Sequence, residues 1–199
     1  MIIQICCSDG CWEEMAPTVD LTSFRRVDHP DSFDTAADAF INLSGIDWRK
    51  TPAGKPYLVG SVLQTSDDLG LSGDVLRIGD WPGFLSNSCW EYAGIMNERL
   101  EKVFTALGKQ PVPVSDQPGL VTFRIISMII NEAYFALEEK ISTKGEIDTA
   151  MKYGTNYPFG PFEWAEKIGL RRVAALLQRL QLESGRYVPS ELLLKEAGL

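Results

Sequence analysis

Apolar residues recur between residues 120 and 141 at positions 120, 123, 126, 130, 134, 137 and 141, in steps of three and four. This spacing places one apolar stripe along a helix. Charged side chains such as Arg124 and Glu132 interrupt the segment, so it does not have the composition of a membrane span. We therefore predict a helix over 120–141 that neighbouring helices or a second subunit bury. Further apolar residues widen the stripe until little is left for water: Val121, Ile125, Met128 and Ile129.

Shorter helices are predicted after this segment. Thr143 and Glu146 have the T-x-x-E spacing of a capping box, which starts a helix. A rigid loop follows, because glycine and proline recur at positions 154, 158, 160 and 161. Another helix is predicted over 162–168 with Gly169 at its end, and 190–197 is expected to form a final helical turn or two.

Residues 1–117 have a different pattern, in which short apolar runs alternate with turn residues. An amphipathic helix is predicted from Glu98 to Leu107, and a polar loop over 47–56. Strands that alternate with helices indicate an α/β layer with a mostly parallel sheet, here followed by an all-α region. The predicted strands span residues 1–7, 23–28, 39–43, 57–62, 75–78 and 111–114, with 23–28 at an edge.

Charge is distributed unevenly along the chain. The net charge is −8; residues 1–117 hold 17 acidic and 9 basic residues, whereas residues 118–199 hold 10 of each. No basic stripe is present to meet phosphates, so nucleic acid is not an expected partner. The acidic balance also weighs mildly against NAD or coenzyme A, although a local helix N-terminus can override a global charge.

The cysteines predict the compartment of the protein. Cys6, Cys7, Cys11 and Cys89 show neither a disulfide nor a zinc spacing, so we expect reduced thiols in the cytoplasm. The chain opens without a basic leader or a long apolar run, and we expect no signal peptide. A metal site on the clustered cysteines would need partners, and the chain has a single histidine, so no metal is expected.

Two motifs in the C-terminal half carry a family resemblance. The segment contains E-I-D-x-A-M-K-x-G followed by Y-P-x-G-P-F-E, between a long helix and a terminal helix. Residues 111–182 thereby resemble the C-terminal domain of the 3-hydroxyacyl-CoA dehydrogenases. The resemblance implies a helical domain over 118–199 and a Rossmann-like domain over 1–117, which is shorter than usual. It also implies NAD as cofactor and an acyl-CoA as substrate. The long helix over 120–141 is too apolar all round for one core to cover, and we therefore predict a homodimer through the C-terminal helices.

The first strand is followed by a turn that departs from a dinucleotide-binding fingerprint. Such a fold places G-x-G-x-x-G here, so that backbone amides approach the pyrophosphate. This chain has Ser8-Asp9-Gly10, which we interpret as a turn with one glycine, and the bulky Trp12 stands where the backbone should be bare. The fingerprint is therefore absent, and this turn argues against ordinary binding of NAD.

The catalytic residues that the resemblance implies are only partly present. The family places a histidine in an H-F-F-N-P loop after a strand, with a glutamate twelve residues later. Glu91 matches that glutamate, and counting back twelve residues reaches Gly79. Asp80 adjoins the empty position; it is either a substitute base, weak at an ordinary pKa of about 4, or simply a turn residue. The single histidine, His29, is expected to be a solvated loop residue.

Two further family residues differ. In the motif P-G-F-x-x-N-R an asparagine lies near the substrate carbonyl, whereas this chain has Phe123 there. An N-T-S-S segment contributes a hydroxyl, and only Ser61 matches it as a substrate-binding candidate. The sequence therefore suggests a member of the family whose standard reaction is lost or impaired. The alternative is a non-catalytic relative that binds acyl-CoA or forms dimers. We also expect Glu138 and Glu139 to form a solvated helix face.

Overall fold

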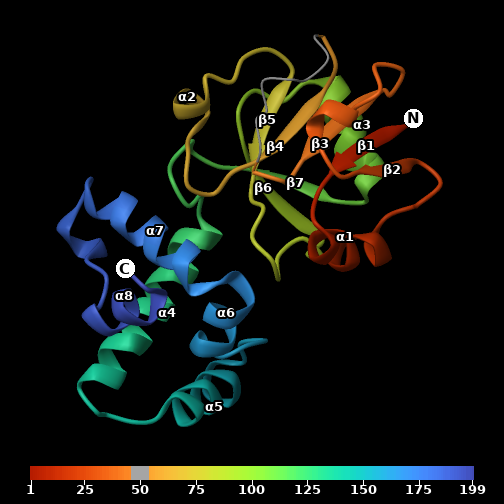
Figure 1. Cartoon of the computed structure of the whole chain (residues 1–199). Helices are drawn as coiled ribbons and strands as arrows, with labels where there is room; N and C mark the ends of the chain where they lie inside the picture. The colour runs from red at the N-terminus through yellow and green to blue at the C-terminus, as the bar shows by residue number, and fades with distance from the viewer. Residues whose placement is uncertain (46–53) are drawn as a thin grey trace. The chain divides into compact units, whose positions relative to one another are not determined.

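The computed structural model describes residues 1–45 and 54–199 (Figure 1). The polar loop predicted over 47–56 falls mostly outside these residues. The chain divides into two compact units, Met1–Leu120 and Val121–Leu199, and each is described by itself.

The N-terminal unit is built on a seven-stranded sheet with the order β2-β1-β3-β4-β5-β6-β7. Neighbours from β2 to β5 are parallel, β6 runs antiparallel to β5, and β7 is parallel to β6. The predicted mostly parallel α/β sheet is confirmed, with β2 at the edge as expected. The strands are β1 (Ile3–Cys6), β2 (Phe24–Val27), β3 (Ala39–Asn42), β4 (Tyr57–Gly60), β5 (Val75–Ile78), β6 (Cys89–Ala93) and β7 (Gln110–Pro113).

The larger core of this unit lies on the face of the sheet that α1 (Asp9–Met15) and α3 (Glu98–Leu107) cover. Asn97 caps α3 by accepting the amide hydrogens of Arg99 and Leu100, and Gly108 ends it in the left-handed conformation. Buried α3 side chains pack on apolar strand residues, as the amphipathic pattern predicts. They are Leu100, Val103, Phe104 and Leu107.

A smaller apolar cluster occupies the other face of the sheet. It contains Phe40, Tyr57 and Val59 together with Leu69 from the four-residue helix α2 (Ser66–Leu69). β3 and β4 are therefore buried on both faces, which explains why they read as continuous apolar runs rather than as an alternation.

In the N-terminal unit, the structure corrects the prediction in three places. Ser8-Asp9-Gly10 begins a helix instead of forming a turn, because the Ser8 hydroxyl accepts the amide hydrogen of Cys11 and caps α1. The short helix α2, whose capping box pairs Thr65 with Asp68, was not predicted. Strand β6 was not predicted. The polar Ser-Asn-Ser sequence precedes it and Glu91 lies within it, so this short strand shows no apolar periodicity.

The C-terminal unit consists of helices. Among the described helices, none is long and apolar enough to cross a bilayer. The predicted long helix is shorter than expected, because Leu120 and Lys140, on either side of it, have left-handed φ angles of 47° and 57°. The helices are α4 (Thr122–Glu138), α5 (Lys144–Thr155), α6 (Pro161–Ile168), α7 (Leu170–Gln181) and α8 (Glu191–Ala197).

The two sequence motifs form the corner between α5 and α6. The buried Asp148 accepts the amide hydrogens of Phe162 and Glu163 and thereby caps α6. A Cβ atom on Gly160 would lie 2.4 Å from the Cβ of Asp148, so only glycine fits there. The Glu163 side chain accepts the amide hydrogen of Gly160 and forms an ion pair with Lys152. The motifs are therefore explained by helix capping and close packing.

Hydrogen bonds hold residues 188–192, near the C-terminus, against α4. The buried Asn131 donates to the Val188 carbonyl oxygen and accepts the Ser190 amide hydrogen, at 2.9 Å and 2.8 Å. Glu138 accepts the amide hydrogen of Leu192 in the first turn of α8. The expectation of a solvated pair is therefore wrong for Glu138, which caps another helix, whereas Glu139 is exposed.

Candidate functional site

The carboxyl edge of the sheet is the place where this fold binds ligands. The chain passes from β1 to β2 on one side and then returns to β3 on the other, so the strand order reverses between β1 and β3. In open parallel sheets, ligands bind outside the carboxyl ends of the strands at such a switch point. The three residues that the sequence marks as candidates, Ser61, Asp80 and Glu91, all lie at or beside this edge.

The strand register aligns two of the candidates with the position of the expected histidine. Gly60 pairs with Ile78 in the parallel β4–β5 ladder, and Ile78 pairs with Tyr92 in the antiparallel β5–β6 ladder. One residue further along, the same registers place Ser61 beside Gly79 and Gly79 opposite Glu91. The side chains of one such row point to the same face of a sheet. The position opposite Glu91 is thus taken by a residue without a side chain.

Asp80 directly follows that row and is half-buried. It packs on the bare backbone of β4, since a Cβ atom on Gly60 would lie 2.6 Å from the Asp80 Cβ. Glycine at position 60 therefore makes room for this side chain.

The Ser61 hydroxyl is bound within its own turn. It accepts the amide hydrogen of Gln64 at 3.2 Å and donates to the carbonyl oxygen of the same residue at 3.1 Å. A substrate would have to compete with these two bonds. The carbonyl oxygen of Ser61 accepts a hydrogen bond from Arg77, a residue that the sequence analysis did not single out.

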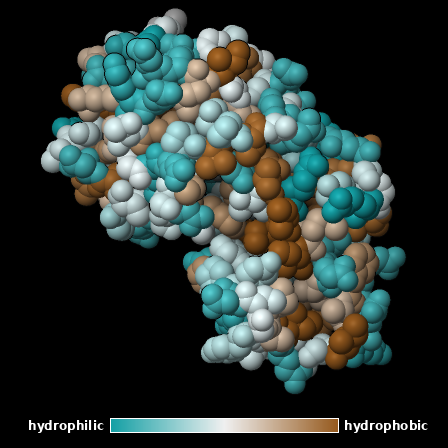
Figure 2. Space-filling view, turned by 180° about the vertical axis from the view of Figure 1, so that it is seen from behind, coloured by the Kyte–Doolittle hydropathy of each residue, from teal (hydrophilic) through white to brown (hydrophobic). Residues whose placement is uncertain are grey.

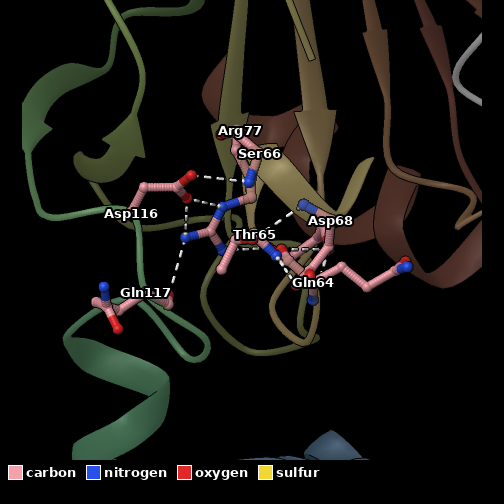
Figure 3. Close-up of polar contacts among 8 residues, drawn as sticks. Gln64, Thr65, Ser66, Asp68, Arg77, Asp116 and Gln117 are labelled. Atoms are coloured by element: carbon pink, nitrogen blue, oxygen red, sulfur yellow. Dashed lines mark hydrogen bonds and ion pairs between the residues drawn. The ribbon is translucent and has the colours of Figure 1, made fainter. Parts of the chain in front are cut away.

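Arg77 is fully buried on β5 and connects three segments of the unit (Figure 3). Its Nε donates to Asp116 Oδ1 at 2.8 Å, and its Nη1 and Nη2 donate to the carbonyl oxygens of Ser61 and Gln117, each at 2.9 Å. Asp116 in turn accepts the amide hydrogen of Ser66 at the start of α2. Burial lowers the pKa of Arg77, and Asp116 opposes this shift. The network therefore holds Ser61 and the start of α2 against the segment 116–117.

The β1–α1 turn was tested for its fit to a dinucleotide, and the residues do not fit. In the fingerprint arrangement, free amides at a helix N-terminus receive the pyrophosphate. Here the Ser8 hydroxyl already accepts the amide hydrogen of Cys11. Asp9 lies at the first helical position, and its carboxylate forms an ion pair with Arg26 at 2.6 Å. α1 itself has only seven residues. A phosphate group there would meet a negative charge and an amide that is already bound.

Sequence reasoning also missed Asp28, which follows β2 at the same edge. In dinucleotide-binding folds a carboxylate about 20 residues after the glycine loop binds the ribose, and Asp28 comes 18 residues after Gly10. Its side chain is 92% exposed and lies 3.4 Å from Arg26. The feature of the sequence that could have identified Asp28 is its position at the end of the second predicted strand. Next to it, the Nδ1 atom of His29 accepts the amide hydrogen of Asp31, and the ring is 46% exposed.

The cysteines at the end of β1 have no thiolate character. Burial raises the pKa of Cys6, and it raises the pKa of Cys7 to about 12. Both thiols are therefore protonated at neutral pH and do not serve as nucleophiles. Within residues 1–45 and 54–199, no three His, Cys, Asp or Glu side chains are grouped to hold a metal ion.

A mostly parallel sheet whose order reverses beside β1, followed by a helical unit, defines a two-domain Rossmann-like protein. Residues 119–197 match the family described as 3-hydroxyacyl-CoA dehydrogenase, C-terminal domain. This part of the chain is therefore similar to the 3-hydroxyacyl-CoA dehydrogenases, a family of NAD-linked oxidoreductases, and the resemblance seen in the motifs is confirmed.

Similar proteins support the same assignment over different lengths. The chain is 42% identical over 92 residues to a 3-hydroxyadipyl-CoA dehydrogenase of Escherichia coli, covering 45% of this chain and 19% of that protein. It is 40% identical over 113 residues to a probable 3-hydroxybutyryl-CoA dehydrogenase of Deinococcus radiodurans, covering 55% and 39%. The chain thus spans well under half of these relatives.

A solved structure extends the likeness to most of the fold. The (S)-3-hydroxybutyryl-CoA dehydrogenase of Ralstonia eutropha has a TM-score of 0.71 at 22% identity, covering 89% of this chain and 71% of that one. At this identity the likeness establishes the fold alone, and it includes the N-terminal sheet.

Proposed function

We propose that this protein is a member of the 3-hydroxyacyl-CoA dehydrogenase family in which the standard dehydrogenation is lost or strongly impaired. The observation that carries this proposal is the register that places Gly79 opposite Glu91. A histidine held by a carboxylate is the base that removes a hydroxyl proton at neutral pH. Glu91 faces a position that lacks an imidazole.

Two other positions support the proposal. Phe123, which stands where the family has an asparagine, is buried on α4, and its phenyl ring offers no hydrogen bond to a substrate oxygen. The β1–α1 turn does not fit a pyrophosphate, so NAD, the cofactor that the family implies, would be held weakly at that turn. In this proposal Glu91 is a remnant of the catalytic pair, and Ser61 is a remnant of the substrate site.

A second candidate function rests on Asp80. Its half-buried carboxylate directly follows the Gly79 position and packs on Gly60, so an aspartate could serve as the base of a variant dehydrogenase. A non-catalytic protein that binds acyl-CoA or forms dimers is the alternative that the missing residues favour. The free cysteines, three of them buried, suit the cytoplasm.

Reduction of acetoacetyl-CoA by NADH tests these alternatives directly. We expect turnover at neutral pH to be undetectable or very slow, because a general base typically contributes about 10²- to 10⁴-fold to the rate. The double variant Gly79→His, Phe123→Asn should recover little, since the β1–α1 turn is unchanged. The measurement is NADH oxidation followed by absorbance, together with a titration of NADH binding.

Turnover by the unmodified protein near the ~10 s⁻¹ typical of enzymes would overturn the proposal. In that case Asp80→Asn should abolish activity, and Asp67→Asn, which changes an exposed aspartate on α2, should leave it intact. Activity that survives Asp80→Asn would remove Asp80 as the base as well.

A further inference from the structure

The loop between β5 and β6 directs three of its backbone amides at one side chain. The carboxylate of Glu14 on α1 accepts hydrogen bonds from the backbone N–H groups of Gly83 and Leu85, each at 2.7 Å, and of Ser86 at 3.1 Å. These donors lie about 70 residues away from Glu14 in the sequence. These three amides, of which those of Leu85 and Ser86 are consecutive, surround one carboxylate in the manner of an anion-binding nest.

A buried lysine holds the carbonyl groups of the same loop. Lys109 is 5% exposed, and its Nζ donates to the carbonyl oxygens of Leu85 at 3.0 Å and Asn87 at 2.8 Å, and to Thr18 Oγ1 at 3.0 Å. The ammonium group also lies 5.3 Å from the centre of the Trp90 ring. Burial lowers the pKa of Lys109, and the charge of Glu14 opposes that shift.

Each of the two charged side chains thus binds the kind of backbone group that suits its sign. The carboxylate accepts from amides, and the ammonium donates to carbonyls. Hydrogen bonds to ionised groups are roughly twice as strong as neutral ones. Glu14 and Lys109 come from α1 and from the residue before β7, so two separate elements hold one loop.

We propose that Glu14 and Lys109 form a clamp that fixes the loop 79–88, and that Glu14 is the internal anion of a nest at residues 83–86. The loop begins at Gly79 and Asp80, which lie at the carboxyl edge of the sheet. The charges of Glu14 and Lys109 therefore fix this part of the candidate site before any ligand binds. α1, whose first turn does not fit a dinucleotide, thereby supports the loop instead. The clamp stands whether or not Asp80 takes part in chemistry.

Hydrogen exchange measured by mass spectrometry on the full chain tests the clamp. Glu14→Ala should speed exchange in the peptide that contains residues 83–86 by roughly tenfold or more, with β1 and β4 little changed. Glu13→Ala, which alters the exposed neighbour on the same helix, should leave the loop as it is. Lys109→Met should also loosen the loop. None of these readouts depends on NADH or acyl-CoA binding.

Chemical rescue by formate tests the nest. A formate ion should enter the space left in Glu14→Ala and slow exchange in the loop again, whereas it should do nothing to the unmodified protein. Unchanged loop exchange in Glu14→Ala, or the absence of a formate effect on that variant, would overturn the proposal. If Glu14→Ala loosens the whole unit, Glu14→Gln decides: its single amide oxygen should give an intermediate, local effect, and a global effect there would also overturn the clamp.

Discussion

Asp148 and Gly160 show how single residues can mark a family through helix capping and close packing. Asp148 caps α6, and the missing side chain of Gly160 is what lets the carboxylate approach. Both positions lie in the motifs by which the sequence is recognised. A motif of this kind identifies a fold, because a cap and a close approach constrain residue type as strictly as catalysis does.

Gly160→Ala should destabilise the C-terminal unit by about 1–3 kcal/mol, the usual cost of overpacking. The added Cβ would lie 2.2 Å from Asp148 Oδ1 in a buried corner. Gly145→Ala is a matched control on α5, because a Cβ there would have nothing within 4 Å and alanine favours a helix. Urea unfolding compares the two. Equal stability of the two variants would contradict the packing argument.

At the level of elements, the sequence predicted most where a single pattern decided the outcome. The α3 boundaries follow from its apolar stripe and from Gly108, and the α5 capping box from Thr143 and Glu146. Strand β6 was missed because its length and its polar surroundings gave no periodicity. α1 was missed because Asp-Gly is ordinarily a turn signal, which here the Ser8 cap outweighs.

The candidate site was predictable only in part. Counting back from Glu91 predicted Gly79 at the position of the expected histidine, and the β5–β6 register, continued by one residue, places the two opposite each other. Arg77, Glu14 and Lys109 carried no local signal, since each looks like an ordinary charged residue until distant segments are brought to it.

The helix caps of the C-terminal unit predict a pH dependence. Hydrogen bonds from Ser142 and Thr143 lower the pKa of Glu146 from its ordinary value, and the hydrogen bond from Lys152 lowers the pKa of Glu163. A lowered folded-state pKa means that the stabilisation is complete above about pH 4.5 and is lost as the pH falls through the folded pKa. Melting temperatures should therefore drop below that pH.

Glu146→Gln and Glu163→Gln should each flatten this acid decline, while lowering stability near neutral pH. The control is Glu139→Gln, at an exposed position beyond the end of α4. Thermal melts at several acidic and neutral pH values give the slopes. An unaltered slope in both capping variants would show that other carboxyls govern the acid response.

At the level of the whole molecule, we propose that the protein is a homodimer through its C-terminal helices. Val121 and Ile125 remain 47% and 53% exposed at the start of α4. Brown patches in Figure 2 show that hydrophobic side chains reach the surface on the face drawn there. An apolar helix face left in water favours a second copy as its cover.

Light scattering at micromolar concentration should give twice the 22.1 kDa of one chain. Ile125→Glu should shift the protein toward the monomer without unfolding it, because the site is exposed. Glu132→Lys, which changes the charge at another exposed position of α4, is the control and should leave the dimer intact if the loss of apolar surface is what separates the chains. A clean single-chain mass for the unmodified protein would contradict the dimer.

The last strand of the sheet affects whether two molecules can pair their sheets edge to edge. In β7 and directly after it, the backbone amides of Gln110 and Val114 donate hydrogen bonds toward β6. The backbone nitrogens at the alternate positions, Pro111 and Pro113, therefore lie on the open edge of the sheet. Proline has no N–H, and this border therefore offers a neighbouring chain few donors to pair with. The opposite border, β2, carries Arg25 and Arg26. Both margins thus discourage the edge-to-edge growth that leads to aggregates.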